Sequence, residues 1–210
     1  MKAIGVTIIA MLLVASGAFA LTVNYGWEDG GVVLGTFGTV LASNVAAPDP
    51  VYGGNHSLKL VDNYSGSATP QAYVAWIQGL QDGDQVTASI WVYDTTSGSP
   101  GSPSGRIWGH WNDTGGINGY SGSASGNSSY PPGTGWSQLS YTWTVASSHT
   151  GLVVEVRTYS DEEDTIWVDD LSVTAPDRDG VTIATPAVPE PASLSVLAIG
   201  ALGLILRRRR

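Results

Sequence analysis

The chain has 210 residues, of which 42% are hydrophobic and 13% charged, with 27 Gly, 8 Trp, 9 Tyr and no Cys. Between residues 21 and 187 only four basic residues stand against 17 acidic ones, which gives this body a net charge of −13. So acidic a body excludes nucleic acid and anionic membrane surfaces as its partners. The many aromatic and β-branched residues also exclude disorder throughout the chain.

The N-terminus reads as an export signal. Lys2 precedes an apolar stretch over residues 3–15, and the small residues Ala18 and Ala20 are suited to signal-peptidase cleavage before Leu21. The alternative is a membrane anchor, but the apolar run is shorter than the roughly 20 residues that a membrane span needs. We therefore expect a signal peptide over residues 1–20, removed by signal peptidase.

Short strands separated by Gly, Pro, Asn and Asp follow from residue 22 to residue 174, with no long apolar pattern at helical period. The predicted strands cover residues 55–61, 72–78, 86–93, 106–113, 137–145, 152–159 and 165–173. Many short strands with turn-rich connections favour an all-β fold, an antiparallel β-sandwich or jelly roll spanning residues 21–174.

The strand over residues 86–93 shows the clearest alternation. Val86 and Ile90 belong to an apolar set that should face the core, which places Trp91 and Tyr93 on the other face. In the strand over 152–159 the same rule places Glu155, Arg157 and Tyr159 away from the core.

Two stretches rich in Gly, Ser and Pro interrupt the strand pattern. They cover residues 97–105 and 115–135, on either side of the strand over 106–113. We expect both to be long surface loops. Such loops often carry the binding function of a sandwich, although a loose insertion without function is an equal alternative.

The C-terminus contains a second signal. Residues 175–187 read as a linker, after which Pro189, Glu190 and Pro191 precede an apolar run over 192–206 and the final Arg207, Arg208, Arg209 and Arg210. Such a run followed by arginines is typical of a stop-transfer signal, a short transmembrane helix with its arginines on the cytoplasmic side. A plain single-pass anchor is the alternative.

This ordered combination over residues 188–210 closely resembles the PEP-CTERM sorting signal of bacterial, mostly Gram-negative, proteins. The resemblance implies recognition and processing by an exosortase, with the helix in the membrane before processing. It also implies a destination in the cell envelope, at the outer surface or in the extracellular matrix, often in association with exopolysaccharide.

The order of short motifs in the body resembles the jelly-roll carbohydrate-binding modules of the galactose-binding-like superfamily. The motifs are Tyr-Gly-Trp-Glu-Asp-Gly at 25–30, Gly-Gly-Asn-His-Ser-Leu-Lys-Leu at 53–60, Leu-Gln-Asp-Gly-Asp at 80–84 leading to Ser-Ile-Trp-Val at 89–92, Gly-Trp at 135–136 before Tyr-Thr-Trp-Thr-Val at 141–145, and Ile-Trp-Val-Asp-Asp-Leu-Ser-Val at 166–173. The resemblance spans nearly the whole body and implies the fold more strongly than it implies a ligand.

That resemblance implies a structural calcium ion that ties the first and last strands together. The side-chain ligands would be Glu28 and Asp169, with Asp170 as a substitute, and backbone groups near Gly53 and Asn55 would complete the site. The alternation places Asp169 on the same face as Leu171, where a bare carboxylate would be costly and where an oxygen-binding cation would remove the cost. The alternative is that Asp169 accepts backbone hydrogen bonds in a turn.

A saccharide site needs flat aromatic faces together with polar groups, and tryptophan and tyrosine dominate the aromatic residues of the body. Trp108 and Trp111 point to opposite faces of their strand, so only one of them can contribute. The predicted platform draws on Trp91, Tyr93, Trp108 or Trp111, Arg157 and Tyr159. The alternative is that these aromatic residues pack beneath loops.

No zinc-motif histidine pair, nucleophile elbow, phosphate loop or cysteine nucleophile occurs in the sequence, so we expect no catalytic residues. The function that follows is a noncatalytic carbohydrate-binding protein, exported and sorted to the surface, with an extracellular polysaccharide or cell-surface glycan as its partner. A structural or adhesive matrix protein without a specific sugar ligand is the alternative. A glycan-active enzyme ranks third, because the carboxylates do not exclude one.

Overall fold

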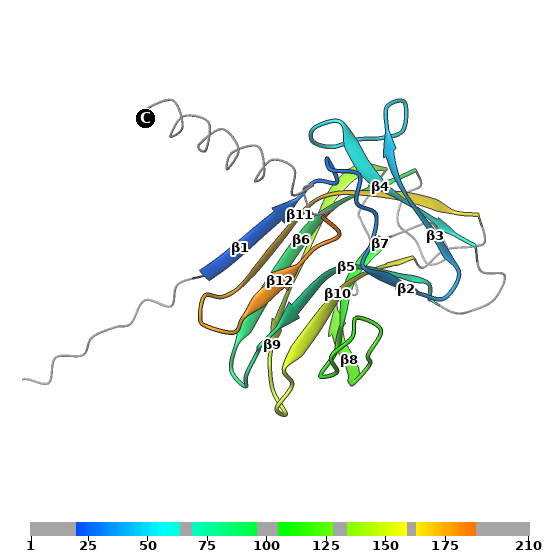
Figure 1. Cartoon of the computed structure of the whole chain (residues 1–210). Helices are drawn as coiled ribbons and strands as arrows, with labels where there is room; N and C mark the ends of the chain where they lie inside the picture. Colours follow the sequence, from blue (N-terminus) through cyan, green and yellow to red (C-terminus); the bar gives the residue numbers. More distant parts are fainter. Residues whose placement is uncertain (1–19, 64–68, 96–104, 128–133, 159–162, 188–210) are drawn as a thin grey trace, which may run out of the picture.

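The computed structural model describes residues 20–63, 69–95, 105–127, 134–158 and 163–187. The predicted signal peptide up to residue 19, the predicted C-terminal helix, the sorting signal over 188–210 and Tyr159 lie outside these residues. Within them the chain forms twelve strands and no α-helix (Figure 1). Consequently, no helix in the described part of the chain is long and apolar enough to cross a membrane.

The first sheet has the order β3-β4-β11-β6-β9, and β1 pairs with the C-terminal half of β11. All of its pairs are antiparallel. Its strands are β1 (Ala20–Tyr25), β3 (Val40–Ala46), β4 (His56–Asp62), β6 (Gln85–Asp94), β9 (Gly135–Thr144) and β11 (Thr165–Pro176).

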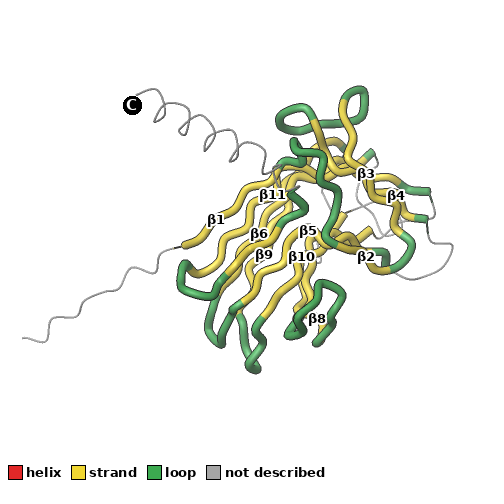
Figure 2. Tube along the Cα trace, viewed as in Figure 1, coloured by secondary structure: helices red, strands yellow, loops and turns green. Residues whose placement is uncertain are grey.

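The second sheet has the order β12-β5-β10-β7-β8, and β2 also pairs with β5. It too is antiparallel throughout. Its strands are β2 (Gly35–Phe37), β5 (Gln71–Gln78), β7 (Gly105–Trp111), β8 (Gly122–Gly126), β10 (Gly151–Thr158) and β12 (Thr182–Ala184). The two sheets lie face to face, joined by loops at the strand ends (Figure 2), which confirms the predicted antiparallel β-sandwich.

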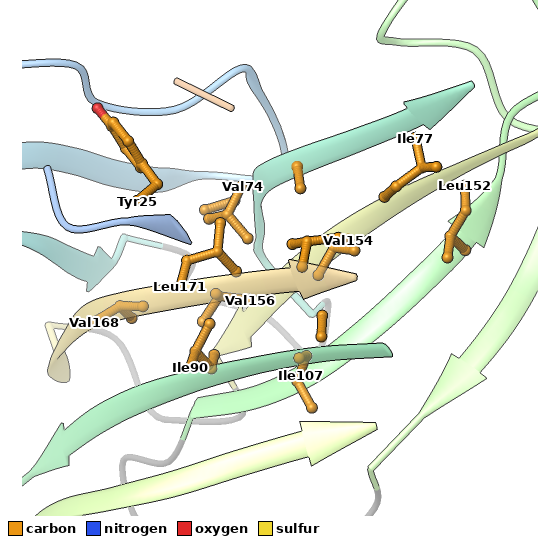
Figure 3. Close-up of a cluster of buried hydrophobic side chains, with 14 of the residues drawn as sticks. Tyr25, Val74, Ile77, Ile90, Ile107, Leu152, Val154, Val156, Val168 and Leu171 are labelled. Atoms are coloured by element: carbon orange, nitrogen blue, oxygen red, sulfur yellow. The ribbon is translucent and has the colours of Figure 1, made fainter. Parts of the chain in front are cut away.

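The core fills the space between the sheets with side chains from alternating strand positions. Ile90 of β6 and Val168 of β11 meet Ile107 of β7 and Val154 of β10, and all four are fully buried (Figure 3). Burying a side chain of this size stabilises the fold by about 1.5–3 kcal/mol. Period-two patterning thus makes one large core without disulfide bonds.

A β-bulge in β11 changes the faces that alternation predicts. The register with β6 shifts between Asp169 and Ser172, and Asp170 adopts a positive φ of 46°. Beyond the shift Leu171 joins the core, while Asp169 stays on the outward face with Trp167. The prediction that Asp169 and Leu171 share a face is therefore wrong, because a bulge inserts an unpaired residue and reverses the alternation.

Residues 175–187, predicted as a linker, are built into the sandwich. Strand β11 continues to Pro176, and β12 then pairs with β5. Between them, the guanidinium of Arg178 donates two hydrogen bonds of 2.6 Å to the Asp84 carboxylate and one of 2.7 Å to the Gly79 carbonyl. The polar composition that suggested a spacer belongs to a turn between two strands.

The second Gly-, Ser- and Pro-rich stretch also differs from expectation. Residues 122–126 form strand β8 at the edge of the second sheet, although 115–135 was predicted as one long loop. Gly126 needs to be glycine, because a Cβ there would lie 2.4 Å from the Ile107 carbonyl oxygen. Glycine in this stretch therefore allows two strands to lie close together, in addition to forming turns.

Candidate functional site

The residues of the predicted platform lie on opposite sides of the molecule. Trp91 and Tyr93 point outward from β6 in the first sheet, whereas Trp108 and Arg157 point outward from β7 and β10 in the second. Because the core separates the two faces, these four side chains cannot contact one ligand unit together. The structure therefore divides the predicted platform into two surfaces.

Trp111 belongs to neither surface. It packs against the core from β7, and its ring stacks on His149 with centroids 4.7 Å apart and an angle of 10° between the planes. His149 is in turn paired with Asp113, its Nδ1 lying 2.8 Å from a carboxylate oxygen. Of the two tryptophans on this strand, Trp108 is the outward one.

The outward face of the second sheet is centred on the carboxylate of Glu155, which is fully buried. One of its oxygens pairs with His110 Nδ1, and the other accepts a hydrogen bond of 2.6 Å from Arg157 Nε. The Gln71 amide can donate to both oxygens, at 3.1 and 3.2 Å. We call these four residues, which come from three adjacent strands, the Glu155 cluster.

Aromatic rings frame the Glu155 cluster. The Arg157 guanidinium lies 4.7 Å from the ring centroid of Trp108, whose Nε1 donates to Ser123 Oγ at 3.1 Å. At the other side Tyr120, 67% exposed, is tilted against the His110 ring at 5.6 Å. The face therefore offers two aromatic rings separated by a fixed group of hydrogen-bonding side chains.

Tyr73 of β5 completes this face. Its ring meets His110 edge-on at 5.1 Å, and it is almost fully buried. Burial, followed by the nearby negative charge of Glu155, raises the pKa of the Tyr73 hydroxyl to about 12. Tyr73 is therefore a neutral hydrogen-bonding group at any physiological pH.

The chemistry of this face suits binding. Glycoside hydrolysis ordinarily uses two carboxyl groups on either side of the scissile bond, whereas Glu155 is the one carboxylate in the Glu155 cluster and pairs with Arg157 and His110. A carboxylate already held by two cationic or polar partners serves to fix Arg157 over Trp108. This arrangement presents guanidinium, amide and aromatic groups to a ligand rich in hydroxyl groups.

Strand parity already places Glu155 with Arg157 on this face, and it could have identified two further pairs from the sequence. Glu155 lies two positions before Arg157, and His110 lies two positions after Trp108, so each pair shares a face. Tyr73 and Gln71 show the same spacing. The three pairs lie side by side because their strands are neighbours in the sheet. No local pattern in the sequence predicts this strand order.

The five predicted metal ligands lie in or beside the loop over residues 52–56. Glu28 accepts hydrogen bonds from the backbone N–H groups of Asn55 at 2.8 Å and His56 at 3.0 Å. These bonds, that from Asn55 foremost, outweigh the effect of burial and hold the pKa of Glu28 below its ordinary value. A Cβ on Gly53 would lie 3.1 Å from both carboxylate oxygens of Asp170, so this carboxylate also borders the loop.

Asp169 shows the alternative that the sequence left open. It is fully buried and accepts backbone hydrogen bonds from Tyr52 at 2.9 Å, Gly53 at 3.0 Å and Asp170 at 2.8 Å. Burial raises its pKa, and these hydrogen bonds oppose the rise. The oxygen donors suit calcium in kind, but no three or more His, Asp or Glu side chains among the described residues are grouped so that they could hold a metal ion.

The outward face of the first sheet has a continuous strip of rings that the sequence did not predict as a unit. Tyr52 stacks on Trp91 at 4.0 Å with an angle of 16° between the planes, and it meets Trp136 edge-on at 5.5 Å. Tyr93 then links Trp136 to Trp167 through two further edge contacts of 5.4 and 5.8 Å. The strip thus joins the loop before β4 to strands β6, β9 and β11.

Comparison of the sequence with protein families identifies the C-terminal signal. Residues 187–210 match the PEP-CTERM protein-sorting motif, which confirms the resemblance seen in Pro189, Glu190, Pro191 and the terminal arginines. This motif implies export to the cell envelope or surface and processing by an exosortase. No protein with curated annotation matches the chain.

Comparison with solved structures identifies carbohydrate-binding sandwiches. The CBM22-1 xylan-binding domain of Xyn10C from Paenibacillus barcinonensis has a TM-score of 0.52 at 16% identity, covering 78% of this chain and 99% of the domain. The CBM22-1–CBM22-2 tandem of the same protein gives 0.51 at 15%, covering 79% and 48%. The CBM22-1–GH10 modules of Clostridium thermocellum Xyn10B, complexed with xylohexaose, give 0.50 at 15%, covering 78% and 30%. At these identities the likeness shows the fold, which is that of carbohydrate-binding β-sandwich modules.

Proposed function

We propose that this chain is an exported, surface-sorted carbohydrate-binding protein without catalytic activity, and that the outward face of the second sheet binds the saccharide. The observation that carries the proposal is the Glu155 cluster, which fixes Arg157 over Trp108 beside the exposed ring of Tyr120. Sugar rings stack on aromatic faces, and their hydroxyl groups pair with the guanidinium and amide groups between them.

Two further observations support this proposal. The sorting motif over residues 187–210 sends the chain to the cell envelope, where polysaccharides are abundant. The fold is that of the xylan-binding domain named above. A neutral polysaccharide of the cell surface or matrix is the proposed partner, an exosortase the proposed processing enzyme, and a Gram-negative bacterium the proposed source.

Calcium at the loop over residues 52–56 also stays a proposal. Glu28 and Asp169 would hold the ion, with Asp170 as a substitute and with backbone groups near Gly53 and Asn55, and its role would be to stabilise the contact between the loop and β11. The oxygen chemistry and the shared position of these residues support it.

Binding of residues 21–187 to a glycan array, followed by calorimetric titration with xylohexaose and the best array ligand, tests the function. Trp108→Ala and Tyr120→Ala should each weaken binding about tenfold, because each removes one aromatic face from the ligand. Leu41→Ala is the control, since Leu41 is 56% exposed on β3 of the other sheet. A folded protein that binds no glycan but still reaches the cell surface would favour the structural or adhesive alternative. Turnover of a glycan would contradict the noncatalytic assignment.

A further inference from the structure

The outward face of the first sheet is organised in rows across neighbouring strands. One row runs from β1 to β9 and consists of four threonines in register, Thr22, Thr174, Thr87 and Thr142. The next row, two residues along each strand, is Asn24, Ser172, Ser89 and Ser140. This part of the face is therefore an uncharged surface of hydroxyl and amide groups.

The face changes abruptly beyond the second row. Trp91 stands next along β6 after Ser89, and Gln138 lies directly opposite it on β9. The step from serine to tryptophan leaves a groove of about 400 Å³. We call it the Ser–Trp groove, and the residues that matter in its lining are Asn24, Ser89, Trp91, Gln138, Asp170 and Ser172.

Trp91 is a rigid wall for this groove. Its ring stacks on that of Tyr52 at 4.0 Å, and the backbone N–H of Tyr52 donates to the buried carboxylate of Asp169 at 2.9 Å. The bulge in β11 places the exposed Asp170, which has a positive φ, in the lining of the groove. Since the wall is fixed before a ligand arrives, binding against it costs little ordering of side chains.

The polarity of the groove defines its ligand. The floor of Ser89 and Ser172 and the flanking amides of Asn24 and Gln138 are neutral donors and acceptors, and Asp170 supplies the one carboxylate among the residues named. An anionic ligand would approach a body of net charge −13, which repels it. A neutral sugar unit satisfies the hydroxyl floor and covers Trp91 with its C–H face.

We propose that the Ser–Trp groove is a second saccharide-binding site, specific for neutral sugars and independent of the face that carries the Glu155 cluster. The two sites lie on opposite sheets, so one molecule holds two polysaccharide segments on opposite sides. The protein then cross-links neighbouring polysaccharide chains, and two weak contacts on one long polymer act together by effective concentration.

The test follows the indole N–H signals of residues 21–187 by NMR during titration with cellohexaose and xylohexaose, with an alginate hexamer as the anionic control. We expect the Trp91 signal to shift with a neutral oligosaccharide and to stay fixed with alginate. The shift should persist in Trp108→Ala, because the second site does not need the first. A Trp91 signal that no neutral oligosaccharide moves would overturn the proposal.

Two substitutions separate the sites. Ser89→Gln fills the floor of the groove and should weaken its binding at least about tenfold, a change of about 1.4 kcal/mol. Thr144→Ala, an exposed change further along β9, is the matched control. If Trp108→Ala abolishes all saccharide binding, the second site is wrong while the proposed function stands. If Ser89→Gln abolishes all binding, the groove is the one site and the Glu155 cluster is not.

Cross-linking has its own readout. The unaltered protein should raise the viscosity of a long neutral polysaccharide that it binds, whereas Trp108→Ala and Ser89→Gln should each still bind it but raise the viscosity less. Equal viscosity for all three proteins would contradict bivalent binding.

Discussion

Removal of the Glu155 carboxylate should destabilise the whole sandwich. Glu155 is fully buried and holds Arg157 by a hydrogen bond of 2.6 Å, so Glu155→Ala leaves a cation without its partner. Breaking a buried pair costs about 3–5 kcal/mol. The lower end applies here, because the Arg157 side chain is 13% exposed and keeps its contact with Trp108. We therefore expect a loss of about 3 kcal/mol, a fall in melting temperature of about 6–12 °C for a domain of this size.

Urea denaturation of residues 21–187, followed by tryptophan fluorescence, measures this cost. Glu155→Gln keeps the shape and one acceptor oxygen, so its loss should be smaller, about 1–2 kcal/mol. Asp179→Ala removes an exposed carboxylate from a turn and should stay within about 0.5 kcal/mol of the unaltered protein. A Glu155→Ala protein that is less than 1 kcal/mol below the Asp179→Ala control would refute the view that this carboxylate anchors the face.

Three further predictions concern the loops and the C-terminal turn. Gly54→Ala should lower the free energy of unfolding by about 2 kcal/mol in urea denaturation, since φ is +70° and the new Cβ would displace the Glu28 carboxylate 2.3 Å away. Gly83→Ala, at a φ of +90° with open space around it, should cost only the backbone strain of about 1 kcal/mol. Equal losses for the two variants would contradict a contribution from Glu28. Burial raises the pKa of Asp84, but the hydrogen bonds from Arg178 and the backbone outweigh burial and hold this pKa below its ordinary value. The stability that Asp84 contributes is therefore present above its pKa in the unfolded chain and is lost as the pH falls through its pKa in the folded protein. Urea midpoints between pH 7 and pH 3 should fall less steeply in Arg178→Ala, and an unchanged slope would exclude the Arg178–Asp84 pair as a cause. Calcium chelation with EGTA should lower the melting temperature if the proposed ion is bound, and an unchanged value with and without added calcium would exclude it.

The fold was largely predictable because its signals are local. Alternation identified β6 and β10 with their buried and outward faces, and the Gly-Asp turn before β6 set its start. Short strands such as β2 and β12, three residues each, have no alternation long enough to detect. They form because β10 leaves one edge of β5 open, and β2 pairs with the N-terminal half of that edge and β12 with the C-terminal half, which is a property of the assembled sheet.

The candidate sites were predictable only residue by residue. The outward direction of Trp91 and of Arg157 follows from parity, but their separation onto two sheets follows from strand order. Strand order arises from contacts between residues far apart in the chain, such as β6 with β11. The bulge at Asp170 is a second such case, since its positive φ is stabilised by loop and strand neighbours rather than by a glycine.

The pairing of β12 with β5 limits the distance between the sandwich and the C-terminal sorting motif. Ala184 is the last paired residue, and the sorting motif begins at residue 187. Three residues span at most about 10 Å even when fully extended, so a membrane or enzyme that held the motif at its first residue would lie close to the sandwich. Mechanical tension on the tail would reach the three-residue strand β12 first and the Arg178–Asp84 pair next, before any core strand. These two contacts would therefore break first under force, while the long core strands of both sheets stay paired.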